Sequence, residues 1–412
     1  MKKLGTKFLI AMLLFGLMGQ IAWVVENMYF NVFIYKMFNA TASDISTMVM
    51  ASAVVAALTT IIMGALSDKL GRRKAFMSFG YIIWGVSIIT FAYIRSITLT
   101  IVMDCVMTFF GSTANDAAYN AWLTDKGDSS NRGIIEGLNS MMPLVSILVV
   151  FGGFMSFNLN EMSAWKTIYY IIGIVTTIIG VIGLFVIEDV KGLKKSESSI
   201  FKTIAYSFEV STIKKNIDLY LVLLAFAIFG ISIQIFMPYL IIYYEQTLKL
   251  SNYVLIMAPA IILAAVVTVL YGKVYDNKGF NVAIKYPMLM LIIGYVFLYF
   301  FTNIILVFIG SLFMMSGYLC GMSVFGARIR DLIPENKAGQ FQGVRIICQV
   351  FIPGVIGPFI GSSILKNAEL ILNSDGTTSF LPNANIFMGA LIIILVLIVF
   401  LFFMLKGRKN EA

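Results

Sequence analysis

The sequence predicts an all-α membrane protein, with twelve transmembrane helices in two pseudo-symmetric bundles of six. Three observations support this fold class. Of the 412 residues, 59% are hydrophobic and 12% are charged, whereas soluble domains carry about a quarter charged residues. Apolar stretches of about 20 residues, the length that crosses a bilayer, recur along the whole chain. Two groups of glycine and aspartate residues also occur twice, at a nearly constant displacement.

The twelve expected helices, numbered I to XII, follow the apolar stretches in chain order. The first stretch comes after three lysines and could pass for a signal peptide. It continues to Phe38 without a clear cleavage site, so we expect a retained helix. The expected helices cover residues 8–35, 43–66, 75–94, 97–122, 134–157, 167–187, 218–244, 252–274, 281–302, 304–327, 340–365 and 385–406.

The positively charged residues predict how these helices are oriented. With twelve helices both termini lie on one side, and the segments on that side hold 25 of the 30 lysines and arginines. Cytoplasmic connections are enriched in these residues. We therefore expect a multi-pass protein of the plasma (inner) membrane with both termini in the cytoplasm. The net charge of +9 then anchors the topology, and no nucleic-acid partner is expected.

An internal repeat divides the chain into two halves. Gly64, Asp68 and Gly71 recur 208 residues later as Gly272, Asp276 and Gly279, and Gly111, Asp125, Gly133 and Gly137 recur 206 residues later as Gly317, Asp331, Gly339 and Gly343. The first group lies at the connection after the second helix of each half, and the second group lies around the connection after the fourth. This correspondence indicates two related bundles. We expect an N-terminal bundle over 1–187, a cytoplasmic linker over 188–217 and a C-terminal bundle over 218–412.

The linker contains apolar residues at helical spacing, namely Phe201, Ile204, Ala205 and Phe208. This spacing predicts a short amphipathic helix on the membrane surface.

Composition excludes several classes of function. The chain has no histidine, which removes His-based proton relays, metal sites and catalytic triads. Its three cysteines, Cys105, Cys320 and Cys348, lie in apolar runs without disulfide or metal spacing. We expect a monomer with no cofactor and no metal. A membrane enzyme or sensor is the weakest alternative, because the loops are too short for a domain and no nucleophile–base pair is visible.

A few polar side chains lie inside the apolar stretches, where each one requires a reason. Helix I carries Glu26, with Trp23, Asn27 and Asn31 spaced to share a neighbouring face. Helix IV carries Ser112, Asn115, Asp116 and Tyr119 at helical spacing, and helix VII carries Gln234 and Tyr239. Carboxyl and amide groups can hydrogen-bond hydroxyls, and Trp23 or Tyr239 can stack on a sugar ring. We expect Trp23, Asn27, Asn115, Asp116, Tyr119, Gln234 and Tyr239 to bind substrate.

Other interpretations of these residues stay open. Asn115 and Ser112 could serve only to hold helices together, and Asp104 could lie near the outer water boundary. Glu26 and Asp116 are the expected proton carriers. No lysine or arginine lies deep in the first bundle, and a carboxylate buried without a cation takes up a proton more readily than one in water.

The connection between helices II and III, Gly64 to Lys74, carries four cations, one carboxylate and two glycines. Gly64 would let two helices approach closely, and Gly71 would permit a tight reversal. The pattern G-x-x-x-D-K-x-G-R-R-K resembles the same loop in the major facilitator superfamily. That resemblance implies a substrate site between the halves, lined by helices I, IV, VII and X.

The resemblance also implies a cytoplasmic gate, which we expect to include Gly64, Asp68, Gly71, Arg72, Asp125 and Arg345. Arg345 is the deepest cation of the second half. It could pair with Asp68 or Asp125, bind substrate, or only extend to the membrane surface.

A narrower resemblance is carried by the run P-x-x-x-G-P-x-x-G on helix XI, from Pro353 to Gly361, and by the aspartate-bearing helix IV. It is similar to the glycoside–pentoside–hexuronide cation symporters and their sucrose-transporter relatives. Helix II lacks the carboxylates that help bind sodium in the melibiose-permease branch. The expected function is a proton-coupled transporter of a sugar or glycoside. The alternative is an exporter of amphipathic drugs or lipids, which the Met- and Phe-rich apolar helices would suit.

Overall fold

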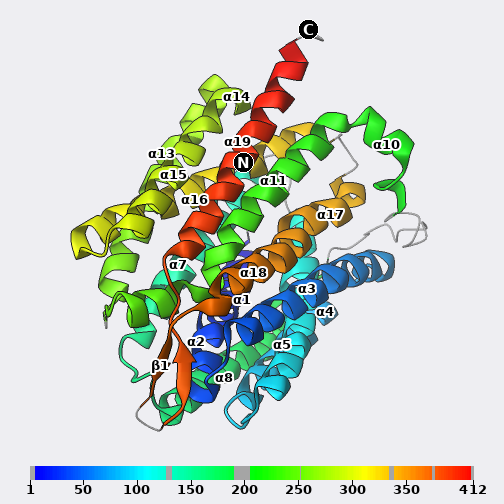
Figure 1. Cartoon of the computed structure of the whole chain (residues 1–412). Coiled ribbons are helices and arrows are strands. Elements are labelled where there is room, and N and C mark those ends of the chain that lie inside the picture. The colour runs from blue at the N-terminus through cyan, green and yellow to red at the C-terminus, as the bar shows by residue number, and fades with distance from the viewer. Residues whose placement is uncertain are drawn as a thin grey trace. The chain divides into compact units, whose positions relative to one another are not determined.

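The computed structural model describes residues 5–126, 132–189, 205–250, 252–333, 338–373 and 376–409. Within these ranges the chain is almost entirely helical (Figure 1). The first half contains α1 (Thr6–Val24), η1 (Val25–Tyr29), α2 (Phe30–Phe38), α3 (Ala42–Leu70), α4 (Lys74–Thr90), α5 (Ile97–Gly111), η2 (Ser112–Tyr119), α6 (Asn120–Lys126), α7 (Arg132–Phe154) and α8 (Met162–Val186).

The second half begins with the short α10 (Val210–Lys215). It continues with α11 (Ile217–Phe236), η3 (Met237–Tyr239), α12 (Leu240–Ile242), η4 (Tyr243–Thr247), α13 (Val254–Lys278), α14 (Phe280–Ala283), α15 (Lys285–Phe300) and α16 (Ile304–Leu332). It ends with α17 (Ala338–Ile346), η5 (Ile347–Phe351), α18 (Ile352–Ile364), η6 (Leu365–Asn367), β1 (Leu370–Leu372), β2 (Thr378–Phe380) and α19 (Asn385–Lys409).

These elements form membrane spans close to those expected from the sequence. Among the described residues, eleven helical segments are long and apolar enough to cross a membrane, and α4 is a shorter apolar helix. Each corresponds to one expected helix, so the prediction of an all-α protein with twelve membrane helices is confirmed. A span is often assembled from several elements in series, as in α1–η1–α2, α5–η2–α6 and α17–η5–α18.

The chain separates into two compact units. Unit 1 comprises residues 1–40 and 51–204, and unit 2 comprises 41–50 and 205–412. The first residues of α3 therefore belong with unit 2. The domain boundaries expected from the sequence stay a prediction. Of the four residues of the expected amphipathic helix in the linker, Phe201 and Ile204 lie outside the described residues, and Ala205 and Phe208 lie just before α10.

Glycines allow close packing of helices within each unit. In unit 1, α4 and α8 meet where a Cβ on Gly85 would lie 2.4 Å from the carbonyl oxygen of Gly173. In unit 2, α15 and α16 meet where a Cβ on Gly294 would lie 2.5 Å from the backbone nitrogen of Met314. Such small residues let helix backbones approach closely in a membrane, where packing replaces the hydrophobic effect as the source of association.

The internal repeat reappears in the backbone conformation. Both α3 and α13 are followed by a glycine with positive φ, 62° at Gly71 and 69° at Gly279. The Gly71 N–H donates to the Ser67 carbonyl at 3.0 Å, and the Gly279 N–H donates to the Tyr275 carbonyl at 2.8 Å. These four residues keep the displacement of 208 found in the sequence. Gly71 therefore ends its helix in the left-handed conformation that glycine adopts most readily.

A small β-hairpin precedes α19 and was not predicted. β1 and β2 pair antiparallel, with Leu370 opposite Phe380 and Leu372 opposite Thr378. Its sequence signal is weak, because each strand is three residues long and the two lie within a loop that reads as polar.

Candidate transport site and gate

Two membrane spans of unit 1 contain wide π-helical turns at their polar residues. The turn η1 includes Glu26 and Asn27, and η2 includes Asn115, Asp116 and Tyr119. A π-helical turn holds an extra residue relative to an α-helical turn and occurs frequently at functional sites. The sequence thus places its candidate residues where the backbone departs from regular helix.

Glu26 lies in the interior of unit 1, with 7% of its surface exposed. Its Oε1 accepts a hydrogen bond from the Thr108 hydroxyl at 2.8 Å. One helical turn away from Thr108, Asp104 is 2% exposed and accepts a hydrogen bond from the Ser52 hydroxyl. Asp104 is therefore packed inside unit 1, and the alternative that it lies near the outer water boundary stays a prediction.

A chain of hydrogen bonds connects three spans of unit 1 beside these acids. The Trp23 indole donates to Asn115 Oδ1 at 3.2 Å, and the Asn115 amide donates to the Tyr81 hydroxyl at 2.8 Å. Tyr81 in turn donates to the Phe15 carbonyl at 2.5 Å. The Trp23 ring also lies 5.1 Å from the ring of Trp84. Asn115 is buried and fully engaged, which favours the interpretation that it holds helices together.

Tyr119 is also buried and engaged within unit 1. Its hydroxyl lies 3.0 Å from the Met12 carbonyl and 3.2 Å from Asn139 Oδ1. On the neighbouring span, the Asn27 amide donates to the Trp23 carbonyl at 2.8 Å and the Asn31 amide donates to the Asn27 carbonyl at 3.0 Å. Asn27 is exposed whereas Asn31 is fully buried, so the two do not share a face as expected.

Some of the expected substrate residues stay accessible in mid-span. Asn27 is exposed, and Trp23 and Asp116 are half-buried. Gln20 and Asn120 extend this accessible polar set by a turn on each span, half-buried and exposed respectively. Polar groups in a membrane span avoid lipid and face protein or water, so we interpret these side chains as a water-accessible face of unit 1.

The two candidates in unit 2 differ in accessibility. Gln234 is half-buried. A Cβ on Gly357 would lie 2.4 Å from the Cβ of Gln234, so Gly357 allows the two helices to pack closely at this point. Tyr239 is fully buried, its hydroxyl donates to the Ala42 carbonyl at 3.0 Å, and its ring lies 6.2 Å from that of Phe380. No substrate could reach Tyr239 in this arrangement without a change in its packing.

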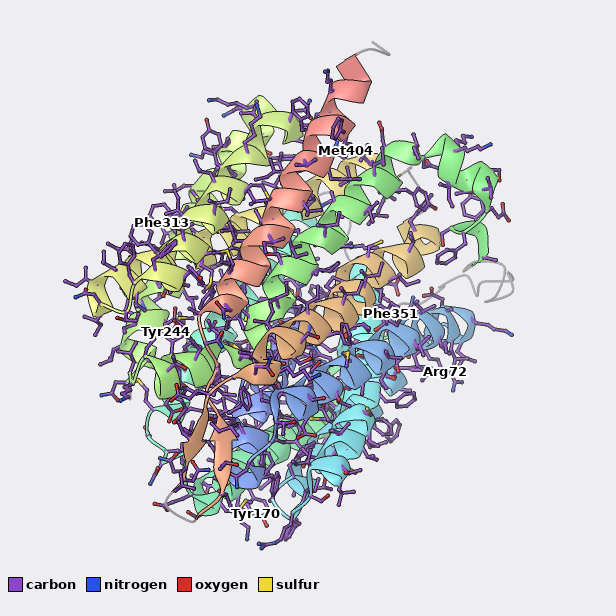
Figure 2. All side chains as sticks on the ribbon, in the orientation of Figure 1. Arg72, Tyr170, Tyr244, Phe313, Phe351 and Met404 are labelled. Atoms are coloured by element: carbon purple, nitrogen blue, oxygen red, sulfur yellow. The ribbon has the colours of Figure 1, made fainter. Side chains whose placement is uncertain are left out.

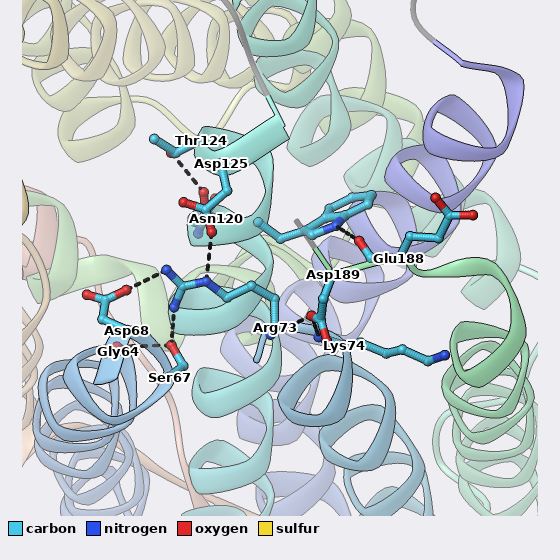
Figure 3. Close-up of polar contacts among 11 residues, drawn as sticks. Gly64, Ser67, Asp68, Arg73, Lys74, Asn120, Thr124, Asp125, Glu188 and Asp189 are labelled. Atoms are coloured by element: carbon cyan, nitrogen blue, oxygen red, sulfur yellow. Dashed lines mark hydrogen bonds and ion pairs between the residues drawn. The ribbon is translucent and has the colours of Figure 1, made fainter. Parts of the chain in front are cut away.

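The region expected to form the gate is built around Arg73 in unit 1 (Figure 3). Its guanidinium lies 2.5 Å from Asp68 and 2.9 Å from Asp125, and donates to the Ser67 hydroxyl at 2.5 Å. Burial alone would lower the pKa of Arg73, but the hydrogen bonds and charges of the two carboxylates outweigh it and raise that pKa. The cluster ties α3, α4 and α6 together at one end of the unit.

Asp189 completes this region from the segment after α8. Its Oδ1 accepts from the backbone N–H groups of Arg73 and Lys74, both at 2.8 Å (Figure 3). These N–H groups begin α4, where the first turn of a helix has unsatisfied donors and a partial positive charge. A carboxylate there satisfies both.

The other expected gate residues are arranged differently. Arg72 is exposed at the tip of the connection between α3 and α4 (Figure 2). A Cβ on Gly64 would meet only Ala117 Cβ at 3.9 Å, so unit 1 itself requires no glycine there. Arg345, in unit 2, is half-buried, and its Nε donates to Gln349 at 3.3 Å.

Unit 2 carries a modified counterpart of this cluster. Asp331, the repeat of Asp125, accepts a hydrogen bond from the Tyr275 hydroxyl. The Arg328 guanidinium lies 5.7 Å from the centre of the Phe280 ring. Unit 2 thus combines an arginine and an aspartate with two aromatic side chains at the corresponding place.

Sequence reasoning noted Asp104 without assigning it to the site, and it missed Arg73, Ser67 and Asp189 as members of the gate region. Asp189 had a weak signal in the sequence, because no Ser, Thr, Asn or Asp stands directly before Lys74 to cap the next helix. Arg73 could not be separated from Arg72 by sequence, since both follow Gly71 in an irregular connection.

Solved structures with the same fold include several transporters. A variant of the nucleoside transporter NupG superposes with a TM-score of 0.75 at 11% identity, covering 96% of this chain and 99% of its own. A bacterial homologue of the human lysosomal transporter Spinster, in an inward-facing and occupied conformation, gives a TM-score of 0.69 at 13% identity, covering 97% and 96%. These identities show likeness of fold.

No curated protein sequence matches the chain. The profile described as Major Facilitator Superfamily matches residues 8–358, which is most of its length. With its membrane helices and its structural neighbours, the chain belongs to the Major Facilitator Superfamily of transporters.

Proposed function

We propose that this transporter carries a sugar or a glycoside by alternating access and couples its movement to protons. The observation that supports this best is the accessible polar face of unit 1, formed by Trp23, Asn27 and Asp116, beside the buried acid Glu26.

The chemistry of this face suits a polyhydroxylated solute. A carboxylate accepts hydrogen bonds from hydroxyl groups, and an amide both donates and accepts them. The Trp23 indole offers an apolar face on which a sugar ring can stack. In this proposal Asn115 positions Trp23, and Tyr119 holds the neighbouring spans through Met12 and Asn139. Gln234 and Tyr239 are the proposed substrate residues of unit 2.

The structural neighbours include a nucleoside transporter. A nucleoside is itself a glycoside, because a base is attached to the anomeric carbon of its ribose. Nucleosides therefore belong in the first set of solutes to test, together with simple sugars and plant-type or bacterial glycosides.

Glu26 is the proposed proton carrier, with Asp116 nearer to the substrate. Within the described part of the chain, Glu26 has a hydroxyl partner and no cation. A membrane potential of 100 mV supplies about 2.3 kcal/mol per charge moved, enough for roughly fiftyfold accumulation. Import together with a proton would use that energy directly.

The Arg73 cluster is the proposed cytoplasmic gate, with Gly64, Asp68, Gly71, Arg72, Asp125 and Arg345 as its expected members. The proposal also includes both termini in the cytoplasm and the protein in the plasma membrane, which the distribution of lysine and arginine supports. One guanidinium paired with two carboxylates holds three helices together at one end of unit 1. This supports the proposal, because a gate must close the transport path at an end of the helices.

The test is transport in proteoliposomes with an imposed pH gradient. The wild-type protein should accumulate a sugar or nucleoside when the outside is acidic. Glu26→Gln should abolish gradient-driven accumulation while retaining exchange of labelled substrate at equal pH. Glu161→Gln is the matched control, because Glu161 is exposed in the loop before α8.

Two results would contradict the proposal. Full gradient-driven accumulation by Glu26→Gln would remove Glu26 as the proton carrier. Thermal stabilisation by amphipathic drugs or lysolipids alone, with no response to sugars or nucleosides, would favour export of such compounds.

A further inference from the structure

We propose that Asp104 is a second proton-binding residue, and that Glu26 and Asp104 together hold one exchangeable proton inside unit 1. The role of this proton in transport rests on the proposed function. The pairing of the two acids is inferred from their hydrogen bonds and their burial.

Each of the two acids has one oxygen engaged and one oxygen free. Glu26 Oε1 accepts from Thr108, and Asp104 Oδ2 accepts from Ser52. Within the described residues, Glu26 Oε2 and Asp104 Oδ1 are buried and have no hydrogen-bond partner. A buried acceptor without a donor is costly, so both acids lack a hydrogen-bond donor for their second carboxyl oxygen.

The two acids occupy one region of the unit. Asp104 and Thr108 are four residues apart on α5, so their side chains lie on one face of that helix. Thr108 donates to Glu26 at 2.8 Å, so the Glu26 carboxyl group lies about one helical turn from Asp104 along α5. The unpartnered oxygens therefore belong to one cluster.

No positive charge compensates this cluster in the described part of the chain. The titratable groups that face it are the Cys105 thiol and the Asp116 carboxyl from its own span, and the Tyr169 hydroxyl from α8. All of these are neutral or acidic. Two carboxylates would leave two negative charges buried together, and one proton removes one of them.

The proton also supplies the missing donor. A carboxyl group that is protonated gains one O–H donor, whereas an ionised one only accepts. Whichever acid is ionised keeps its hydroxyl donor, Thr108 for Glu26 or Ser52 for Asp104. Because Ser52 is on α3, the protonation state is linked to contacts among three membrane spans.

The test is an infrared pH titration of the purified full-length protein, following the carbonyl band of protonated carboxyl groups. In Asp104→Asn, the band that remains from Glu26 should move its midpoint to lower pH by about one unit or more, a tenfold change in proton affinity, because a neighbouring negative charge is gone. Glu26→Gln should move the Asp104 band in the same direction.

Two further variants keep both acids and guard against misfolding. Ser52→Ala and Thr108→Val each remove a donor that favours the ionised form, so each should move the band to higher pH. Glu161→Gln should leave the titration unchanged. Midpoints in Asp104→Asn and Glu26→Gln that equal those of the wild type would overturn the shared proton.

Sodium provides the sharpest contrary result. If sodium, but not potassium, removes the carbonyl band at constant pH, the pair is a sodium site and the proposal is wrong. Coupled midpoints in a protein that transports no sugar would support the pair and contradict the proposed function. Proton-driven sugar transport by a protein in which the midpoints of Glu26 and Asp104 are independent would support the proposed function and contradict the shared proton.

Discussion

At the scale of single residues, the Arg73 cluster of unit 1 shows how one side chain can connect several helices. Arg73 is almost fully buried, and its guanidinium satisfies Ser67, Asp68 and Asp125 at once. The planar fork of arginine suits such multiple contacts better than the point charge of lysine. Arg72, its neighbour in the sequence, is exposed.

Replacing Arg73 by alanine should destabilise unit 1, because two carboxylates lose a partner. Hydrogen bonds to charged groups contribute about 1.5–3 kcal/mol each, and we expect a loss in that range since Asp68 is half-exposed. Thermal unfolding of the purified variant measures it. Arg72→Ala is the matched control, and an equal loss in both variants would contradict the assignment.

The pH dependence of this contribution has a defined sign. The pKa of Arg73 is raised in the folded protein, so its stabilising effect is present at lower pH and is lost only as pH rises through that raised value. The difference in unfolding temperature between wild type and Arg73→Ala should therefore stay constant from neutral to mildly alkaline pH. A difference that vanishes within that range would argue against a charged Arg73.

At the scale of elements, the wide turns explain where prediction from sequence failed. Helix bounds followed from apolar length and were correct to within a few residues, because a bilayer requires about 20 apolar residues. Faces were less predictable. A π-helical turn at residues 25–29 inserts a residue into the helical period. Asn27 and Asn31 therefore lie on different faces of the span, although they are four residues apart.

The same cause applies to the fourth span. Ser112, Asn115, Asp116 and Tyr119 read as one stripe at the α-helical period, but they lie in the π-helical turn η2. Asn115 and Tyr119 are buried, whereas Asp116 is half-buried. Sequence therefore located the polar region of the candidate site and could not assign which residues a solute would reach.

The contact between α4 and α8 should be sensitive to a single methyl group. A Cβ on Gly173 would lie 2.6 Å from the Gly85 carbonyl oxygen, so Gly173→Ala must push the helices apart. Overpacking typically costs about 1–3 kcal/mol, which thermal unfolding would detect. Gly152→Ala is the control, because a Cβ there meets nothing within 4 Å, and it should be neutral or stabilising.

The end of α13 should depend on glycine for a different reason. Gly279 has φ 69° and ψ 176°, a conformation that is essentially limited to glycine and costs other residues about 1–3 kcal/mol. Gly279→Ala should lower the unfolding temperature, whereas Gly272→Ala, in open space on the same helix, should not. Equal behaviour of the two would show that α13 can end in another way.

At the scale of the whole molecule, the distribution of lysine and arginine predicts the orientation in the membrane. With Cys105, Cys320 and Cys348 replaced by alanine, a cysteine at Asn160 should react with an impermeant reagent in intact cells. A cysteine at Lys278 should react only after the cells are opened. Both positions are exposed, and the opposite pattern would invert the topology.

Asp189 has a practical consequence for dividing this transporter into two separately expressed halves. A cut made at the expected boundary after Ile187 would remove the carboxylate that accepts from the first N–H groups of α4. The amino-terminal fragment would then begin α4 uncapped, directly beside Arg73. A cut placed beyond Asp189 would keep these two hydrogen bonds, so two more residues at the end of the fragment would preserve the start of α4.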